Sequence, residues 1–303
     1  MKRIVRMMGL CALVALAFTS CKKKENNGNL TLKATMPQTV SNGRTWNDGN
    51  ILKWSENDEI KVLHNGEDKT FMIMSGEENN KTATFDATGE GDFLADLLTN
   101  DSVYFAYYPN AISTGDGAKV VIESTQTMNA TQRFMTNTYP MFGTNNGDNI
   151  VFNSNAGVLR IQLQKDTQAT GAVKVGSLEL TSLNTNDALA GEVTYTNDYV
   201  LNPNGILPVA NPSNSIILNC ETPVELTGDG NVNPTYAFDF VLFEGTLAGQ
   251  FNLKVRNDAG ELIGDFTASA SDTNPDENNY HIIDRKYVTI MPVKALTGAV
   301  IPE

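Results

Sequence analysis

The chain contains few of the residues from which disulfide-stapled and metal-binding proteins are built. Only three cysteines and two histidines occur among its 303 residues. His64 and His281 have no second ligand at zinc-site spacing, and no Gly-x-Ser-x-Gly sequence marks a nucleophile elbow. The sequence alone does not exclude a Ser-His-Asp catalytic triad. We nevertheless expect no metal, no cofactor and no enzyme activity.

A long apolar segment is also missing. The run from Leu10 to Phe18 is shorter than the roughly 20 residues that cross a bilayer. Because basic residues precede it, it predicts a signal peptide over residues 1–20. The run leads into Phe18-Thr19-Ser20-Cys21, which resembles the lipobox of bacterial lipoproteins. We therefore predict lipidation of Cys21 and anchoring in the outer membrane. An ordinary signal peptide with an accidental cysteine is the alternative.

Basic residues are scarce. The chain has 22 basic and 35 acidic residues, and the predicted signal carries three of the basic ones, which leaves a net charge of −16. Nucleic acid and anionic lipid head groups bind basic patches, so neither is an expected partner. Residues 21–29 (CKKKENNGN) are expected to be a tether, in which Lys22, Lys23 and Lys24 either rest against the membrane or are simply solvated.

The lack of cysteine excludes a disulfide framework in the mature chain. Cys11 lies in the predicted signal and Cys21 is predicted to carry lipid, which leaves Cys220 as the remaining thiol. A chain of this length can bury a sufficient core without staples. Cys220 lies in the apolar run SIILNC and is expected to be a small core residue.

Short alternating segments fill the rest of the sequence, and no helix longer than two turns is convincing. Asn-Gly and Gly-Asp turns between them indicate antiparallel hairpins. We predict an all-β protein with two tandem antiparallel β-sandwich domains of transthyretin-like or Greek-key type, covering residues 30–145 and 146–303 and divided at GTNNGDN (143–149). A short helix is expected at FLADLL (93–98). The predicted strands are LTLKATM (30–36), EIKVL (59–63), KTFMIM (69–74), KTATF (81–85), SVYFAYY (102–108), KVVIES (119–124), VLRIQLQ (158–164), GSLELTSL (176–183), GEVTYT (191–196), SIILNC (215–220), TYAFDFVLF (235–243), FNLKVRN (251–257), ELIGDFTAS (261–269) and KYVTIMPV (286–293).

Few stretches suggest a ligand. Two Asx-rich segments, 229–233 and 272–276, lack the glycine and glutamate positions of an EF-hand loop and are interpreted as turns. The aromatic residues of YFAYYP could stack on sugars, but strand alternation favours the core for them. They are Tyr104, Phe105, Tyr107 and Tyr108.

One succession of motifs is more specific. It begins with Trp54-Ser55, a turn at Glu56-Asn57-Asp58, and a strand opened by Ile60. It continues with the segments TFDA (84–87), VYFAYYP (103–109), VVIES (120–124), Gln126, PMFG (140–143) and VLRIQL (158–163). This order resembles the fimbrillin, or Mfa-like, lipoproteins of Gram-negative anaerobes. Asn57 stands where that family has glycine, and Asn tolerates positive φ next best.

The resemblance implies a subunit of a type V pilus that assembles by strand exchange with other pilus subunits. A protease would cut after an arginine in the first loop, here between Arg44 and Thr45 in the turn-rich NGRTWNDGN (42–50). The cut would release a strand whose inward residues are Leu30, Leu32, Ala34 and Met36. The groove would then accept a strand from a neighbouring subunit.

The apolar residues of the tail, Val293, Ala295, Val300 and Ile301, make it the candidate donor. A stalk, an anchor and a tip role all remain open, and a host protein or glycan is a further candidate partner. The alternative function is a lipid-anchored binding protein, for glycans for example, that does not polymerise. The third hypothesis for the function is a hydrolase.

Overall fold

The computed structural model describes residues 31–37, 40–41, 53–86, 103–109, 112–129, 139–146, 149–154, 156–201, 207–228, 234–243, 245–248, 250–268, 280–283, 287–291 and 293–303. Within these residues nearly all regular structure is β-strand, with one short helix, α2 (Asn197–Leu201). The predicted all-β class is confirmed. Each predicted strand overlaps a strand of the structure, whereas the predicted helix at 93–98 lies outside the described residues.

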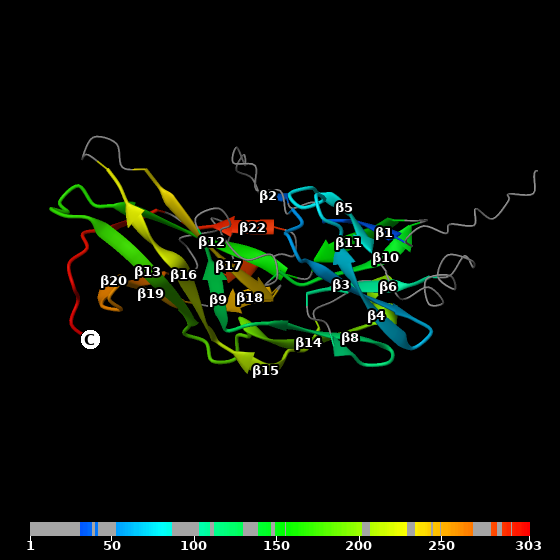
Figure 1. The fold of residues 1–303 in the computed structure, drawn as a ribbon. Helices are drawn as coiled ribbons and strands as arrows, with labels where there is room; N and C mark the ends of the chain where they lie inside the picture. The colour runs from blue at the N-terminus through cyan, green and yellow to red at the C-terminus, as the bar shows by residue number, and fades with distance from the viewer. Residues whose placement is uncertain are drawn as a thin grey trace, which may run out of the picture.

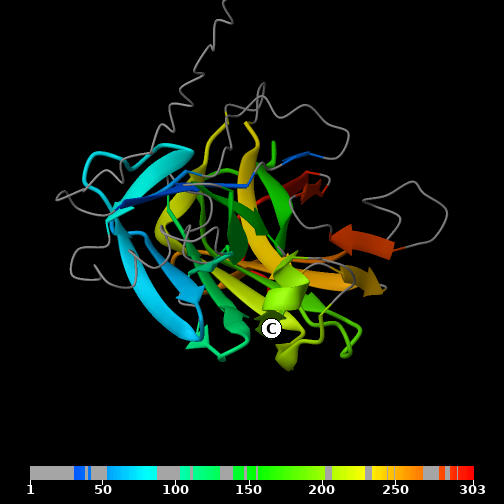
Figure 2. The same cartoon turned by 90° about the vertical axis from the view of Figure 1, so that its right-hand side faces the viewer.

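Seven strands between residues 31 and 154 close into a barrel. In order around it they are β1 (Thr31–Thr35), β11 (Asn149–Ser154), β10 (Met141–Asn146), β6 (Phe105–Tyr108), β3 (Glu59–His64), β4 (Glu67–Ile73) and β5 (Thr82–Asp86). The first and last of these strands pair with each other, so the ring leaves no free edge. In Figure 2 the blue and cyan strands of this barrel curve round one side of the molecule.

The other described strands form open sheets. One contains β17 (Tyr236–Phe243), β12 (Ala156–Lys165), β22 (Tyr287–Ile290) and β2 (Val40–Ser41), with β23 (Lys294–Leu296) also on β12. A second contains β20 (Leu262–Ala268), β19 (Phe251–Arg256), β13 (Val173–Ser182), β16 (Ser215–Leu226) and β9 (Thr125–Met128). The smaller sheets are β15 (Ala210–Ser213), β14 (Ala190–Thr196), β8 (Gly117–Ile122) and β7 (Ile112–Ser113), and the pair β18 (Gly245–Ala248) and β21 (Tyr280–Ile283).

Some strands that precede residue 146 pair with strands that follow it. The strands β8 and β9 precede it but pair with β14 and β16, which follow it. The turn-rich segment at 143–149 joins β10 to β11 as a hairpin inside the barrel. The division into domains at this segment remains a prediction.

The molecule is elongated, with the barrel near one end and the sheet of β13, β16, β19 and β20 near the other (Figure 1). The apolar side chains that alternate along the strands form one contiguous core cluster. Strands with one solvated face show this alternation directly, as in β19, where Phe251, Leu253 and Val255 are buried. Strand β17, at the edge of its sheet, is instead buried on both faces from Phe238 to Phe243.

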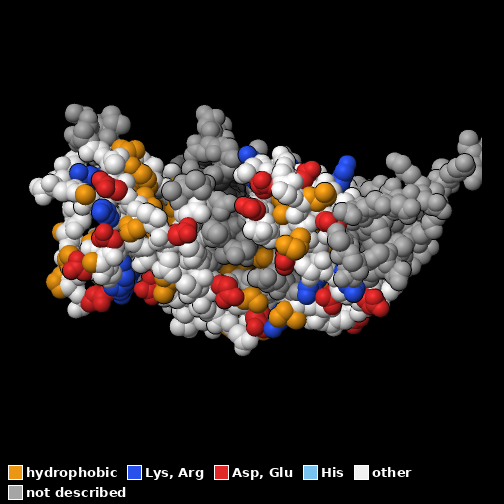
Figure 3. Space-filling model, in the orientation of Figure 1, with side chains coloured by type: hydrophobic (Ala, Val, Ile, Leu, Met, Phe, Trp, Pro, Cys, Tyr) orange, Lys and Arg blue, Asp and Glu red, His pale blue; other side chains and the backbone are white. Residues whose placement is uncertain are grey.

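The exposed surface is mixed in charge. Acidic and basic side chains lie among scattered apolar ones on the face shown in Figure 3. The described part of the chain has no helix with the length and apolarity that a membrane span requires.

Candidate functional site

The first strand is inserted between two others. On one edge β1 pairs antiparallel with β5, with Leu32 opposite Phe85 and Ala34 opposite Ala83. On the other edge it pairs in parallel with β11, with Ala34 opposite Ile150. No described strand pair joins β5 to β11 directly, and β1 lies between them. Loss of β1 would therefore leave two unpaired strand edges facing each other across a groove one strand wide.

The inward side chains of β1 and of the residue that follows it are completely covered. Leu32 and Ala34 have no exposed surface and Met36 is 1% exposed, whereas Thr31 and Lys33 face solvent. Leu30, the fourth residue predicted to face inward, lies outside the described residues. The groove under β1 thus consists of a series of side-chain pockets as well as two hydrogen-bonding edges.

The Trp-Ser motif forms a tight turn beside this groove. Asn57 has a φ of 65°, a positive value in keeping with the glycine that the fimbrillin family has at this position. The buried carboxylate of Asp58 accepts hydrogen bonds from the Ser55 N–H at 2.6 Å and from the Tyr108 hydroxyl at 2.7 Å. Burial raises the pKa of Asp58 above its ordinary value of 3.8, and the two hydrogen bonds act in the opposite direction.

The turn fixes Trp54, which contacts β1 directly. The Trp54 N–H donates to the Asn80 carbonyl at 3.0 Å, and the Trp54 carbonyl accepts from the Asn79 N–H at 2.7 Å. The indole is 1% exposed, and its Nε1–H donates to the Ala34 carbonyl at 3.0 Å. From the sequence, Trp54 was recognised only as part of the Trp-Ser motif. Its contact with β1 was not foreseen, because Ala34 lies 20 residues earlier in the chain.

The predicted cleavage and lipidation sites are not among the described residues. Cys21 lies in the segment 1–30, and Arg44 and Thr45 lie in the segment 42–52. Immediately before Arg44, the two residues of β2 pair in parallel with β22, at Val40 opposite Tyr287. Cleavage at Arg44 and lipidation of Cys21 remain predictions.

The C-terminal tail, residues 293–303, is docked on its own chain. Strand β23 pairs in parallel with the end of β12, and the Leu296 carbonyl accepts from the Asp166 N–H at 2.8 Å. The Leu296 side chain is buried above Gly264, where a Cβ would lie 2.7 Å from its Cδ2. This leucine was not among the predicted donor residues, although its position between Ala295 and Gly298 in an apolar tail was visible.

The end of the tail is held more lightly. The Ile301 N–H donates to the Leu262 carbonyl at 2.8 Å, and Glu303 pairs with Arg256 at 2.5 Å. Val293, Val300 and Ile301 are 40%, 55% and 37% exposed. Ala295 is exposed as well, so all four predicted donor side chains present apolar surface to solvent.

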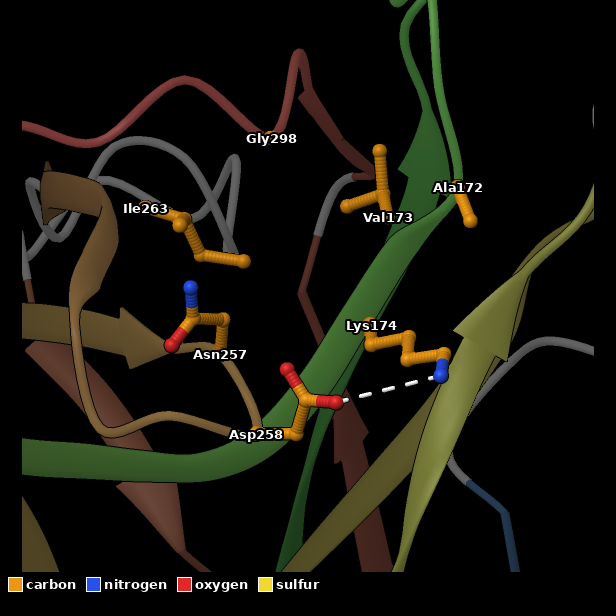
Figure 4. Close-up of a pocket in the computed structure, with 7 residues that line it drawn as sticks. All are labelled: Ala172, Val173, Lys174, Asn257, Asp258, Ile263 and Gly298. Carbon is orange, nitrogen blue, oxygen red and sulfur yellow. Dashed lines mark ion pairs between the residues drawn. The ribbon is translucent and has the colours of Figure 1, made fainter.

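A cleft of about 270 Å³ lies beside the tail at Gly298 (Figure 4). Val173 and Ile263 supply its apolar wall, and a Lys174–Asp258 ion pair of 3.8 Å crosses its mouth. Gly298 has a φ of 77°, and a Cβ there would lie 3.0 Å from a methyl group of Val173. Both partners of the ion pair are well exposed, so the cleft is an open surface feature.

The other candidate ligand positions belong to the core. Tyr104, Tyr107 and Tyr108 are at most 1% exposed and Phe105 is partly buried against the core. The core interpretation of this cluster is confirmed, although strand alternation predicted only some of its rings there. Cys220 is only partly buried against the core, and burial raises the pKa of its thiol to about 11. His64 is buried at the end of β3. The described residues contain no group of three or more side chains that could hold a metal ion.

Two buried polar contacts were missed by the sequence analysis. Arg160 on β12 and Asp239 on β17 form a two-pronged ion pair with distances of 2.7 and 2.6 Å. The Gln126 side chain, one of the motif residues, exchanges two hydrogen bonds with the backbone of Val241. A charged residue inside an apolar strand, such as the Arg in VLRIQL, is the signal that could have indicated a buried partner.

No protein-family model and no curated protein matches this chain. Several solved structures are similar to it. A protein from Bacteroides ovatus that is proposed to act in cell adhesion has a TM-score of 0.44 at 10% identity, over 85% of this chain and 88% of that one.

Two further neighbours are named as fimbrial proteins. One, from Bacteroides ovatus, has a TM-score of 0.37 at 12% identity over 88% of this chain and 49% of that one. The tip fimbrial protein Mfa3 from Porphyromonas gingivalis has a TM-score of 0.33 at 11% identity, over 86% of this chain and 94% of that one. Cell-adhesion and fimbrial proteins are thus among the similar solved structures, and the sequence motifs resemble the same kind of protein.

Proposed function

We propose that this protein is a fimbrillin-type subunit of a cell-surface pilus that assembles by strand exchange. It is exported as a lipoprotein with lipid on Cys21, is anchored in the outer membrane and is cut between Arg44 and Thr45. The cut releases β1, and the C-terminal tail of a neighbouring subunit fills the groove. A host protein or glycan is the partner proposed for the finished pilus. Two tandem β-sandwich domains of transthyretin-like or Greek-key type remain part of this proposal.

The observation that carries the proposal is the position of β1 in the chain and in the barrel. It is the first described strand, yet it is paired on both edges and, together with Met36 directly after it, buries three side chains. Because the strand is terminal, a single cut downstream suffices to separate it from the rest of the chain. The other strand before Arg44, β2, pairs through two residues at the edge of its sheet.

The placement of donor and groove supports growth into a filament. In Figure 1 the C-terminus and β1 lie toward opposite ends of the molecule. A contact between two different surfaces of identical subunits repeats without closing unless the rotation happens to form a ring. A tail at one end and a groove at the other therefore suit head-to-tail assembly.

The experiment that tests this proposal uses the chain from residue 22 onward and an arginine-specific protease. We expect a new N-terminus at Thr45, followed by a ladder of oligomers that resists SDS. The Arg44→Lys variant keeps the positive charge but is not a substrate, so it should stay monomeric. If Arg44 is not cut in the folded protein, or if the cut protein loses β1 without forming oligomers, the proposal is wrong. Glycan binding by the uncut monomer would then favour the alternative function of a binding lipoprotein.

A further inference from the structure

Trp54 lies beneath the groove and contacts both of its walls. Its ring centroid is 4.9 Å from that of Phe85 on β5 and 5.7 Å from that of Phe152 on β11, both in edge-to-face geometry. Tyr108, fixed by Asp58, packs edge-on at 5.5 Å. The strands β5 and β11, which carry Phe85 and Phe152, are the two between which β1 is inserted. Aromatic pairs at such distances and angles are attractive, so Trp54 links β5 to β11 independently of β1.

The backbone of Trp54 is held by contacts that do not involve β1. It is hydrogen-bonded to Asn79 and Asn80, and neither residue belongs to β1. Departure of β1 removes the Ala34 carbonyl, which accepts the buried indole N–H. An incoming strand covers the indole N–H again, and a covered donor without an acceptor is unfavourable, so the groove favours an occupant that places a carbonyl at that point. The groove then distinguishes among registers of the incoming strand.

The pocket at this point is small. Ala34 is fully buried opposite Ala83 and Ile150, and its neighbours on the same face are the larger Leu32 and Met36. A larger side chain at the Ala34 position would overpack the barrel. The groove therefore accepts a large, small, large sequence at alternate positions.

The geometry points to Trp54 as the residue that sets the register of strand exchange, by binding the carbonyl of Gly298 from a second copy of this chain. Leu296, Gly298 and Val300 then occupy the pockets left by Leu32, Ala34 and Met36. This inference rests on the proposed function and adds the register and the residue that selects it.

The competing register fits less well. It would place Val293, Ala295 and Thr297 in the same three pockets. The hydroxyl of Thr297 would then enter the apolar pocket of Met36, and burying a hydroxyl without a partner is unfavourable. Pro292 would also take the place of Thr31, which is paired with Asp86, and proline has no N–H to donate to a ladder.

The register can be measured by disulfide trapping. The hydroxyl oxygens of Thr35 and Thr82 are 2.9 Å apart, so side chains at these two positions meet across the strands. In the inferred register Ala299 takes the place of Thr35, whereas in the competing one Leu296 does. The test uses the cut protein with Thr82→Cys and Cys220→Ser, and peptides of residues 291–303 that carry Ala299→Cys or Leu296→Cys. We expect the Ala299→Cys peptide to cross-link at least tenfold faster, and preferential cross-linking of the other peptide overturns the register.

The role of Trp54 is tested by peptide affinity. Trp54→Phe retains a ring but lacks the N–H, and it should weaken binding of the unmodified peptide about tenfold, the scale of one lost hydrogen bond. Trp46→Phe is the matched control and should bind as the parent does. Thermal unfolding of the uncut variants checks that the barrel is intact. Equal affinity in Trp54→Phe and the parent overturns the role of Trp54, whereas failure of the parent itself to bind any peptide counts against strand exchange.

Discussion

At the scale of single residues, Asn57 has a backbone conformation that most side chains avoid. Its φ of 65° is left-handed, where an alanine is disfavoured by roughly 1–2 kcal/mol and where asparagine and glycine are tolerated. We expect Asn57→Ala to lower the free energy of unfolding by about 1 kcal/mol and Asn57→Gly to change it little. Urea denaturation with an unchanged m-value measures the difference. Equal stability of the two variants would contradict the prediction that an alanine side chain is strained at this φ.

Asp58 makes stability depend on pH. Burial raises the pKa of this carboxyl in the folded state above 3.8, so the folded state holds the proton more tightly than the unfolded chain does. The contribution of Asp58 to stability is therefore greatest below pH 3.8 and decreases as the pH rises through the folded-state pKa. In urea titrations across this range, Asp58→Asn should remove that part of the slope. An identical slope in the variant and the parent would show that Asp58 does not cause it.

Arg160 and Asp239 form a buried ion pair between β12 and β17. Both side chains are at most 5% exposed. Removing one partner leaves an unpaired buried charge, so Arg160→Met should lower the free energy of unfolding by about 3–5 kcal/mol. Adding Asp239→Leu to that variant should recover part of the loss. A double-mutant cycle in urea measures the coupling, and additive effects would show that the two side chains do not interact.

These residues also show how far the sequence could be interpreted. The positive φ at Asn57 was expected from the resemblance, because the family has glycine at this position of the turn. The partner of Arg160 lies 79 residues away, and only the pairing of β12 with β17 brings the two together. No local pattern fixes that register. The hydrogen bond of Trp54 to Ala34 was missed for the same reason.

At the scale of elements, strands were predictable and their partners were not. Alternation along each segment specified the buried face of β1 and of β19. It could not specify that β9 would pair in parallel with β16, or that β1 would be inserted between β5 and β11. Those pairings depend on the packing of the whole core.

The tail is an element with a buried anchor, and its docking can be tested. Leu296 is 1% exposed, and a buried Leu→Ala change typically loses roughly 2–5 kcal/mol of packing. We expect Leu296→Ala to release the tail, so that the Ile301 N–H, now bonded to the Leu262 carbonyl, exchanges with solvent at least tenfold faster.

Val300→Ala is the matched control for this exchange experiment, because Val300 is 55% exposed and should leave the exchange rate unchanged. Mass spectrometry of hydrogen exchange in the uncut protein reports both variants. Unchanged protection in Leu296→Ala would mean that other contacts hold the tail.

At the scale of the whole molecule, the barrel depends on a strand that follows the boundary predicted from composition. The hairpin of β10 and β11 spans residues 141–154, and a cut at 145/146 divides it. A fragment of residues 30–145 keeps β1 but loses β11, so the barrel has two open edges and the pocket of Phe152 is empty. A fragment of residues 30–154 retains all seven barrel strands.

We expect the longer fragment, 30–154, to unfold in a cooperative urea transition and the shorter one, 30–145, to show none, because an open sheet with missing core residues cannot bury enough apolar surface. Trp54 fluorescence in a Trp46→Phe background follows the transition, since the indole contacts Phe152 on the strand that differs between the two fragments. The same Trp46→Phe substitution in the full chain gives the reference signal for a closed barrel. A cooperative transition of equal midpoint in both fragments would show that the barrel does not need β11, and the groove beside β1 would then have only one defined wall.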